Sequence, residues 1–244
     1  MLDLINKVKR FVKVILNKIG YDIVSLYYRK TLIDFLNYFQ INVVYDVGAN
    51  LGQFATGLRG SGYQGKIISF EPLSSTYQYL KTTADSDFLW QTLNYALGNY
   101  NGKAIINVAA DSDFSSLRNP LPRLIVRFKK SMPVAKEEIH IRKLDSIFKN
   151  FYEDGSRYFL KVDTQGYEKE VIQGGINSLK FFYGIQLELP AFPLYEGQSS
   201  FPEMLNLLDD NGFQLVLVNP VNYHKVKPSV MDFDCIFVNR AFDN

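Results

Sequence analysis

The chain has 244 residues, 47% hydrophobic and 21% charged, which is ordinary for a soluble globular protein. Its net charge of +2 argues against a whole-chain nucleic-acid binder. The single cysteine, Cys235, excludes an intramolecular disulfide framework and suits a reducing compartment, so we expect a cytoplasmic protein. The two histidines, His140 and His224, lack metal-ligand spacing, and we expect no metal.

The first thirty residues carry a net charge of +5, which leaves −3 on the remainder. In the opening stretch, "MLDLINKVKRFVKVILNKIG", apolar residues recur at helical spacing, and lysines interrupt any run long enough for a signal peptide or membrane span. We expect a helix over residues 1–20, packed outside the main domain with a solvated basic face. Peripheral contact with the inner face of the membrane is the alternative, because membrane-surface helices share this pattern.

A second helix is expected over residues 25–40, and from residue 43 strand-like and helix-like segments alternate. This alternation predicts an α/β fold whose mostly parallel sheet is covered on both faces. We expect an N-terminal helical appendage, 1–42, and a main domain, 43–244. No helix separates the last two strands, so they should pair antiparallel. The expected strands are Val43–Val47, Lys66–Phe70, Leu89–Tyr95, Tyr158–Val162, Gly184–Leu189, Gln214–Val218 and Cys235–Asn239, with helices over 52–60, 74–84, 167–180 and 200–211.

Residues 103–142 depart from this alternation of strands and helices. Two strand-like runs, "KAIINVA" and "EEIHIRK", flank a loop that contains Pro120, Pro122 and Pro133. Long loops inside compact domains are uncommon without a role. We therefore expect an insertion that adds strands at the edge of the sheet and shapes a pocket.

Four of the expected strands end in a carboxylate. These residues are Asp46, Glu71, Asp163 and Glu188. Ligands of open α/β sheets bind beyond the carboxyl ends of the strands, so the four side chains should converge on one site. A carboxylate at a strand end is costly unless it is paired, hydrated or used, and four together suggest a site for hydroxyls, amines or a cation.

The glycines after the first strand narrow the choice of ligand. Residues 43–54, "VVYDVGANLGQF", give D-x-G-x-x-x-G and not the G-x-G-x-x-G of dinucleotide folds. Asp46 replaces the first glycine and would repel a pyrophosphate. An adenosine-bearing cation fits better, with Glu71 accepting from both ribose hydroxyls, and S-adenosylmethionine is such a molecule. A simple strand-to-helix turn at Gly48 and Gly52 is the alternative.

The chain also resembles the FkbM family of S-adenosylmethionine-dependent methyltransferases. The match covers residues 43 to 240, and "KVDTQGYE" with a preceding "LD" is its most specific part. The resemblance implies a class I methyltransferase fold, with a Rossmann-like seven-stranded sheet, and methyl transfer to an oxygen, often on a sugar of a glycan or natural product. The matching stretches are "YDVGANLGQF", "ISFEP", "LNYALG", "SSL", "RKLDSIF", "LKVDTQGYEKEVIQGG", "IQLELPAFPLYEGQ" and "DFDCIFVN".

Residue roles follow from the resemblance where the motifs match. The residues expected to bind the cofactor are Asp46, Gly48, Asn50, Gly52, Glu71, Asn94 and Ser116. The first four would wrap the methionine end and the ribose edge, and Asn94 would lie near the adenine. Ser115 and Ser116 would border the pocket from the insertion, although Asn94 and the serines also suit plain turns. Lys161 is expected to pair with a carboxylate or to bury its stem.

Methyl transfer to an alcohol requires removal of the hydroxyl proton as the new bond forms. We expect Asp163 to be the base, because it heads the most specific motif, and Glu188 to orient it or the substrate. These residues end adjacent strands about 5 Å apart, so each raises the pKa of the other. A divalent cation held by both carboxylates is one alternative, and a purely structural pair bonded to backbone N–H groups is another.

The acceptor is expected to be a small molecule or glycan, with no nucleic acid involved. Tyr167 and Tyr195 are candidates to stack on a sugar ring, and His140 is a candidate to face the pocket, although each also suits a packed core. Two rival functions stay open: a nucleotide-sugar oxidoreductase on a Rossmann sheet, and a non-catalytic membrane-associated module of the same fold. The missing G-x-G-x-x-G disfavours the first, and the complete motif set disfavours the second.

Overall fold

The computed structural model describes residues 31–223 and 229–243, together with residues 12, 16 and 18. The helix expected over residues 1–20 and the side chain of His224 therefore lie outside the described residues. Within the described part of the chain, none of the helices combines the length and the apolar character needed to cross a membrane.

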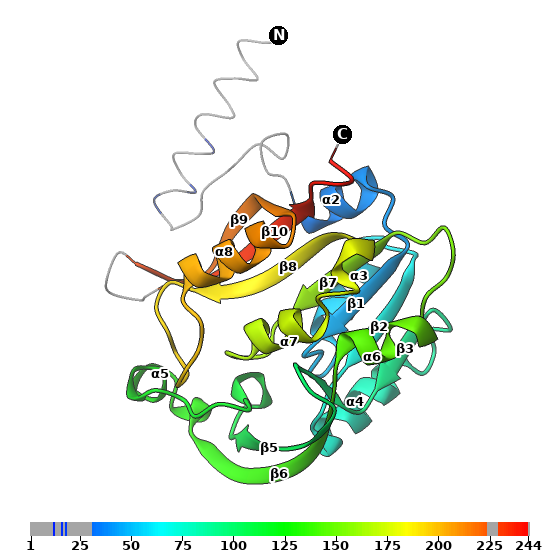
Figure 1. The fold of residues 1–244 in the computed structure, drawn as a ribbon. Helices are drawn as coiled ribbons and strands as arrows, with labels where there is room; N and C mark the ends of the chain where they lie inside the picture. Colours follow the sequence, from blue (N-terminus) through cyan, green and yellow to red (C-terminus); the bar gives the residue numbers. More distant parts are fainter. Residues whose placement is uncertain (1–11, 13–15, 17, 19–30, 224–228, 244) are drawn as a thin grey trace.

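A seven-stranded sheet forms the centre of the fold (Figure 1). Its strand order is β3-β2-β1-β7-β8-β10-β9, and only β10 runs antiparallel to its neighbours. This confirms the predicted α/β class with a mostly parallel sheet and an antiparallel final pair. The strands are β1 (Val43–Val47), β2 (Lys66–Phe70), β3 (Trp90–Leu93), β7 (Tyr158–Val162), β8 (Phe182–Pro190), β9 (Phe213–Tyr223) and β10 (Val230–Asn239).

Three of these strands, β1, β2 and β7, have the predicted bounds, because each is a short apolar run that is buried on both faces. The last two strands are longer than predicted. β9 and β10 pair along their whole length, from Phe213 with Asn239 to Tyr223 with Val230, so their polar ends also satisfy their backbone groups in the hairpin.

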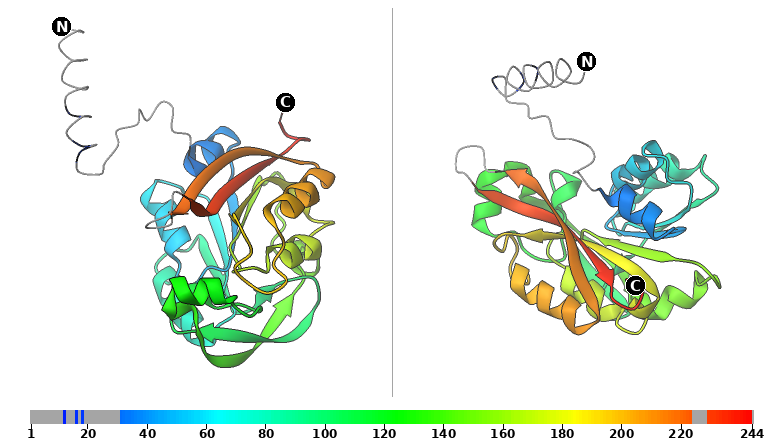
Figure 2. Two further views of the ribbon diagram at one scale, coloured as in Figure 1. Left: turned by 90° about the vertical axis from the view of Figure 1, so that its left-hand side faces the viewer. Right: turned by 90° about the horizontal axis from the view of Figure 1, so that it is seen from above.

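Helices cover both faces of the sheet (Figure 2). One apolar cluster lies between the sheet and α2, α3 and α4, and a second lies between the sheet and α6, α7 and α8. The main helices are α2 (Leu32–Tyr38), α3 (Gln53–Gly60), α4 (Ser74–Ala84), α7 (Glu168–Gly174) and α8 (Phe201–Asp210), and α6 is the short segment Leu144–Ile147. The boundary predicted after residue 42 falls just before β1, and it stays a prediction. Phe35 and Leu36 of α2 belong to the same apolar cluster as Val44 of β1.

The helix expected over 167–180 is shorter than predicted. α7 ends at Gly174, whose missing side chain lets it pack against the Gly98 carbonyl; a Cβ there would lie 1.8 Å from that oxygen. A separate 3₁₀ turn, Leu179–Phe181, follows. The helix thus ends where its backbone packs against the backbone of Gly98, a tertiary contact that helix propensity does not predict.

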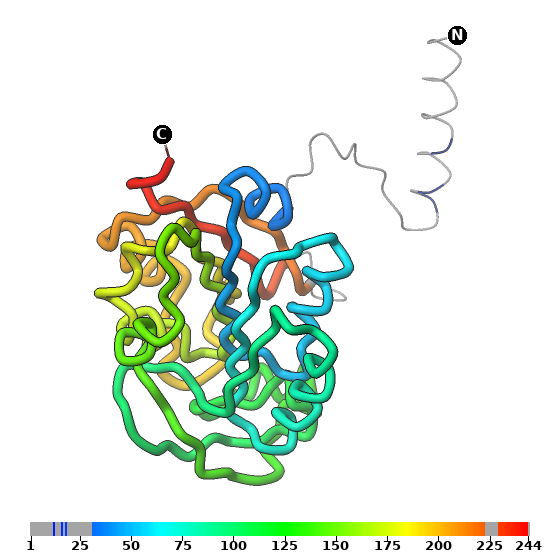
Figure 3. Tube along the Cα trace, turned by 90° about the vertical axis from the view of Figure 1, so that its right-hand side faces the viewer, coloured from blue at the N-terminus to red at the C-terminus, as the bar shows by residue number. Residues whose placement is uncertain are grey.

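The insertion does not extend the main sheet, so that part of the prediction was wrong. β5 (Gly102–Ala109) and β6 (Pro133–Arg142) pair with each other, and β6 pairs with β4 (Ala96–Leu97), giving a separate three-stranded sheet. Its own small apolar cluster packs against Leu73 at the start of α4. Between β5 and β6 lie a 3₁₀ turn, Ser112–Phe114, and helix α5, Pro122–Arg127. This small sheet lies at the opposite end of the molecule from the C-terminus (Figures 1 and 3).

Candidate functional site

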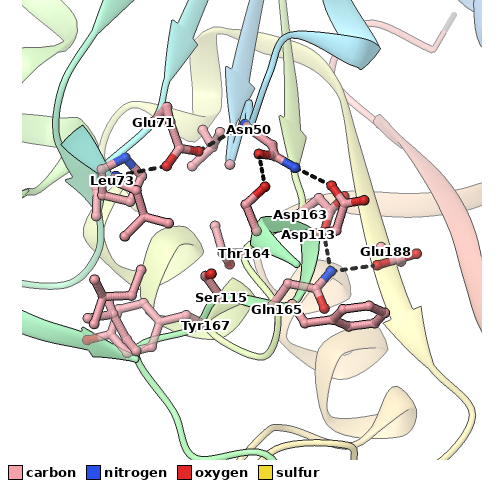
Figure 4. Close-up of a pocket in the computed structure, with 18 of the residues that line it drawn as sticks. Asn50, Glu71, Leu73, Asp113, Ser115, Asp163, Thr164, Gln165, Tyr167 and Glu188 are labelled. Carbon is pink, nitrogen blue, oxygen red and sulfur yellow. Dashed lines mark hydrogen bonds between the residues drawn. The ribbon is translucent and has the colours of Figure 1, made fainter. Parts of the chain in front are cut away.

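A cavity of about 350 Å³ opens between the main sheet and the insertion, at the carboxyl ends of β1, β2, β7 and β8 (Figure 4). This volume lies within the usual range for small-molecule sites. Five carboxylates line the cavity, and among the described residues no lysine, arginine or histidine does so. They are Glu71, Asp113, Asp163, Glu188 and Asp232. The cavity therefore favours a cationic ligand.

Gly48 brings the ends of β1 and β7 together. Its φ is +76°, and a Cβ at this position would lie 1.8 Å from the carbonyl oxygen of Asp163. Glycine is therefore required here for a close approach of two backbones. Gly48 also lines the cavity, and its contact with the cofactor stays a prediction.

Gly52 does not line the cavity, and its contact with the cofactor stays a prediction. It begins α3 with a φ of +91°, and a Cβ there would meet the Trp90 ring at 2.8 Å. Gly52 thus serves the packing of α3 against Trp90. This role agrees with the alternative interpretation of Gly52 as part of a simple strand-to-helix turn.

Glu71 occupies the expected place at the end of β2. Its two carboxylate oxygens accept hydrogen bonds from the backbone N–H groups of Asn50, at 2.9 Å, and Leu73, at 2.8 Å. The residue is 5% exposed, and burial raises the pKa of its carboxyl to about 7. Glu71 lines the cavity, and each carboxylate oxygen accepts one of these bonds, so the group has the capacity to accept from two further hydroxyls.

Asn50 joins the first loop to the insertion. It lies in the left-handed region, with φ of +47°, its Nδ2 donates to Asp113, and its Oδ1 accepts from the Ser112 hydroxyl at 2.8 Å. Burial, followed by the charge of Asp111, raises the pKa of Asp113. Sequence reasoning missed Asp113, because no motif distinguishes it from other acidic residues of a loop.

Asp46 does not line the cavity, and its contact with the cofactor stays a prediction. The strand register places Asp46 beside Ser69 of β2 and Lys161 of β7. Its carboxylate accepts from the Ser69 hydroxyl at 3.0 Å and lies 3.2 Å from the Lys161 ammonium. Asp46 is completely buried, so the pair is an internal ion pair of the sheet.

Lys161 has the predicted carboxylate partners. Burial lowers the pKa of its ammonium, but the Asp46 and Asp163 carboxylates outweigh that effect and raise it overall. The ammonium also lies 3.7 Å from Asp163 and donates to the Gly48 carbonyl at 3.3 Å. Lys161 thus connects the inner ion pair to the loop that borders the cavity.

Asp163 and Glu188 lie together, as the strand order predicts, and both line the cavity. Gln165 donates from Nε2 to Asp163 at 2.8 Å and to Glu188 at 3.2 Å (Figure 4). Burial raises the pKa of Glu188 well above its ordinary value, and the charge of Asp163 adds to this effect. The Asp163 side chain is 33% exposed and so accessible from the cavity.

Asp232 of β10 adds a fifth carboxylate that sequence reasoning did not select. It lies opposite Pro190 in the antiparallel pair and accepts from Asn222 Nδ2 at 3.0 Å. It is 6% exposed, and burial raises the pKa of its carboxyl. The stretch "DFDCIFVN" contains it, but only the hairpin shows that this part of β10 reaches the cavity.

Two predicted cofactor residues lie away from the cavity. Asn94 is exposed, and its Nδ2 donates to the carbonyls of Glu71 and Pro72, each at 3.0 Å. Ser116 is buried and donates its hydroxyl to the Gln165 carbonyl at 2.6 Å, whereas Ser115 lines the cavity. The polar groups of Asn94 and Ser116 are thus bound by backbone carbonyls, and their contacts with the cofactor stay a prediction.

The three candidate substrate residues differ in position. Tyr167 lines the cavity. Tyr195 is 1% exposed and donates its hydroxyl to Gln165 Oε1 at 2.9 Å, so it supports the site from behind. His140 is exposed and lies opposite Lys103 in the small sheet. Neither Tyr195 nor His140 lines the cavity, and their contacts with a substrate stay predictions. Among the described residues, no group of three or more histidine, cysteine or acidic residues is placed to hold a metal ion.

Comparison with protein families found one matching model, the methyltransferase FkbM domain, over residues 46–215. No curated protein matches the chain.

Several solved structures are similar in fold. A variant of LepI, in complex with SAH and a substrate analogue, is 12% identical, with 82% of this chain and 43% of that chain covered and a TM-score of 0.42. A putative tRNA (m1A22) methyltransferase of Streptococcus pneumoniae, with S-adenosyl-L-methionine, is 11% identical, with 82% and 66% covered and a TM-score of 0.47. Magnesium protoporphyrin IX methyltransferase of Synechocystis PCC 6803, with bound SAM, is 10% identical, with 85% and 77% covered and a TM-score of 0.47. The chain spans less than two thirds of the first two of these proteins.

Proposed function

The chain belongs to the FkbM methyltransferase family, and from this we propose that it transfers the methyl group of S-adenosylmethionine to a hydroxyl oxygen of a sugar, in a glycan or a glycosylated natural product. The observation that carries the proposal is the meeting of Glu71 with the pair Asp163 and Glu188 in one acidic cavity. The first carboxylate suits ribose hydroxyls, and the pair suits a hydroxyl that must lose a proton.

The residues of the cavity fit S-adenosylmethionine. The carboxylate of Glu71 has lone pairs for both ribose hydroxyls, and Asp113, held by Asn50, suits the ammonium of the amino-acid end. Leu73, Leu97 and Ile106 supply apolar walls for the adenine. When bound, the cofactor supplies a methyl group on a positively charged sulfur. The net negative lining stabilises that charge.

The acceptor side of the site is the end formed by Asp163, Glu188 and Asp232. Asp163 is the proposed base, because its carboxylate is partly exposed and can accept the proton of an incoming hydroxyl. Glu188 is proposed to orient Asp163, since Gln165 donates a hydrogen bond to both carboxylates, or to orient the substrate. The apolar side chains Leu124 and Phe128 line the same cavity and suit the face of a sugar ring.

Calorimetry with S-adenosylmethionine, S-adenosylhomocysteine and NAD tests the cofactor. We expect the first two to bind and NAD not to bind; the opposite result would favour the oxidoreductase alternative. A turnover assay with labelled methyl groups and an array of sugars and glycosides tests the reaction. Binding without turnover on any acceptor would favour a non-catalytic module. Mass spectrometry of surface glycans from cells with and without the gene then identifies the acceptor.

We also propose a cytoplasmic location for the protein, with a small molecule or a glycan as its partner. The single cysteine, Cys235, is free and buried, which suits a reducing compartment. The basic segment 1–20 is proposed to lie outside the methyltransferase domain, and contact with the inner membrane face is its alternative role.

A further inference from the structure

Gln165 is the common partner of the two carboxylates at the acceptor end. It follows β7 in a left-handed backbone conformation, with φ of +54°, and its Nε2 donates one hydrogen bond to Asp163 and one to Glu188. A side-chain amide nitrogen carries two protons and no acceptor. Both contacted carboxylate oxygens are therefore acceptors, and the contact favours the charged form of each group.

Tyr195 fixes the direction of this amide. Its hydroxyl donates to Gln165 Oε1 at 2.9 Å, with the Phe114 carbonyl as a second acceptor at 3.2 Å. Burial raises the pKa of Tyr195, so the hydroxyl keeps its proton at physiological pH. If the amide flipped, its oxygen would face two carboxylate oxygens, which repel it. Only the observed direction satisfies all three neighbours.

The surroundings of the pair otherwise oppose negative charge. Two positive groups act on this cluster of described residues: the Lys161 ammonium lies 3.7 Å from Asp163, and the charge of Arg127 acts on Asp232. The acidic groups whose charges act on the pair are Asp113, Glu168, Asp232 and Asp234, and Asp46 lies behind Lys161. Like charges this close disfavour ionisation. The two N–H groups of Gln165 are the neutral donors that offset this repulsion.

We propose that Gln165 is a positioning residue whose amide, directed by Tyr195, holds the Asp163 and Glu188 carboxylates in fixed positions for proton removal from the acceptor and favours the charged form of Glu188. The role of Asp163 as base rests on the proposed function. The positioning of the two carboxylates by the Gln165 amide does not depend on that function. Without the amide, Glu188 should hold its proton to higher pH, and the two carboxylates should lose their fixed arrangement.

Carboxyl ¹³C NMR titration of the cofactor-free protein tests this directly. In Gln165→Met, which keeps the length but removes the donors, the Glu188 signal should titrate at higher pH than in the native protein. Tyr195→Phe, which keeps the ring beside Gly166, should shift this signal in the same direction by a smaller amount. Gln165→Asn is a second variant that tolerates the left-handed backbone but is too short to reach both carboxylates.

Ser116→Ala is the matched control, since it removes a hydrogen bond to the same residue but to its backbone carbonyl. It should lower thermal stability and leave the Glu188 titration unchanged. With an acceptor from the turnover screen, Gln165→Met should lower transfer at pH 7 about tenfold, the effect of one charge-assisted hydrogen bond, and regain activity at high pH. Affinity for S-adenosylmethionine should stay the same.

An unchanged Glu188 titration in both Gln165 variants, or an equal loss of rate at every pH, would overturn the inference and leave Gln165 a structural residue. If the Glu188 titration shifts as expected but the native protein transfers no methyl group, the positioning of the carboxylates by Gln165 stands and the proposed function fails.

Discussion

Lys161 and Asp46 form an ion pair inside the sheet, with 3.2 Å between the ammonium nitrogen and the carboxylate oxygen and side chains that are 8% and 0% exposed. The two residues are direct partners in the register of β7 and β1. The pair holds the ends of these strands behind the cavity without facing the ligand itself.

This burial predicts a large and non-additive effect on stability. Lys161→Met leaves the Asp46 carboxylate buried without its partner, and we expect it to lower the free energy of unfolding by about 3–5 kcal/mol. The double variant Lys161→Met/Asp46→Asn should be more stable than the single one. Urea denaturation measures both. A single variant as stable as the native protein would contradict the assignment.

Glu71→Ala should weaken S-adenosylmethionine binding roughly a hundredfold, since charge-assisted hydrogen bonds to two ribose hydroxyls are worth about 3 kcal/mol. Glu137→Ala is the control: Glu137 accepts from the backbone and hydroxyl of Ser74 next to the same loop but does not line the cavity. Calorimetry should find near-native affinity for this control.

The same carboxylate predicts a pH dependence of cofactor binding. Because the pKa of Glu71 is raised to about 7, lowering the pH through that value protonates it and removes acceptor capacity. Affinity should therefore fall as the pH is lowered through this value in the native protein, and this Glu71-dependent fall should be absent in Glu71→Gln. An equal slope in both proteins would assign the dependence to another group.

Glu168 predicts a pH dependence of stability. One of its oxygens accepts from the Thr164 and Gly166 backbone, and burial raises the pKa of its carboxyl from 4.5 to about 7. The folded protein thus binds a proton that the unfolded chain has released, so the contribution of Glu168 to stability falls as pH rises from about 4.5 to about 7. Urea unfolding at several pH values gives the free energy of unfolding of the native protein and of Glu168→Gln. The native value minus the variant value should fall over this interval and level off above it.

Asp163→Asn should keep the shape of the site and the affinity for cofactor while lowering methyl transfer at least about a hundredfold, the low end for loss of a general base. Retained turnover would remove Asp163 from the proposed mechanism. Inhibition of the native protein by chelators would instead indicate a metal at the carboxylate pair.

For the basic N-terminal segment, flotation with anionic liposomes distinguishes the two expectations. If the membrane alternative holds, the full chain floats and a chain lacking residues 1–20 does not. Absence of binding, or binding that survives the deletion, favours a helix with a solvated face. Cofactor affinity of the shortened chain should stay native.

Several features of the protein follow from the sequence alone. Short apolar runs predict β1, β2 and β7 with their observed bounds, and the alternation with helices predicts a parallel sheet. Parallel strands present their carboxyl ends at one edge, which is why Glu71, Asp163 and Glu188 meet in the cavity as expected.

Only the tertiary structure decided which other polar groups reach that cavity. Asp46 ends its strand like the other three acids, but its register partner Lys161, far along the chain, binds it inside the sheet. Asp113 and Asp232 enter the site through the insertion and the final hairpin, and Tyr195 reaches Gln165 from behind. Local patterns set the ends of strands, whereas partners distant in sequence determine whether a strand-end carboxylate is neutralised in the core or exposed to a ligand.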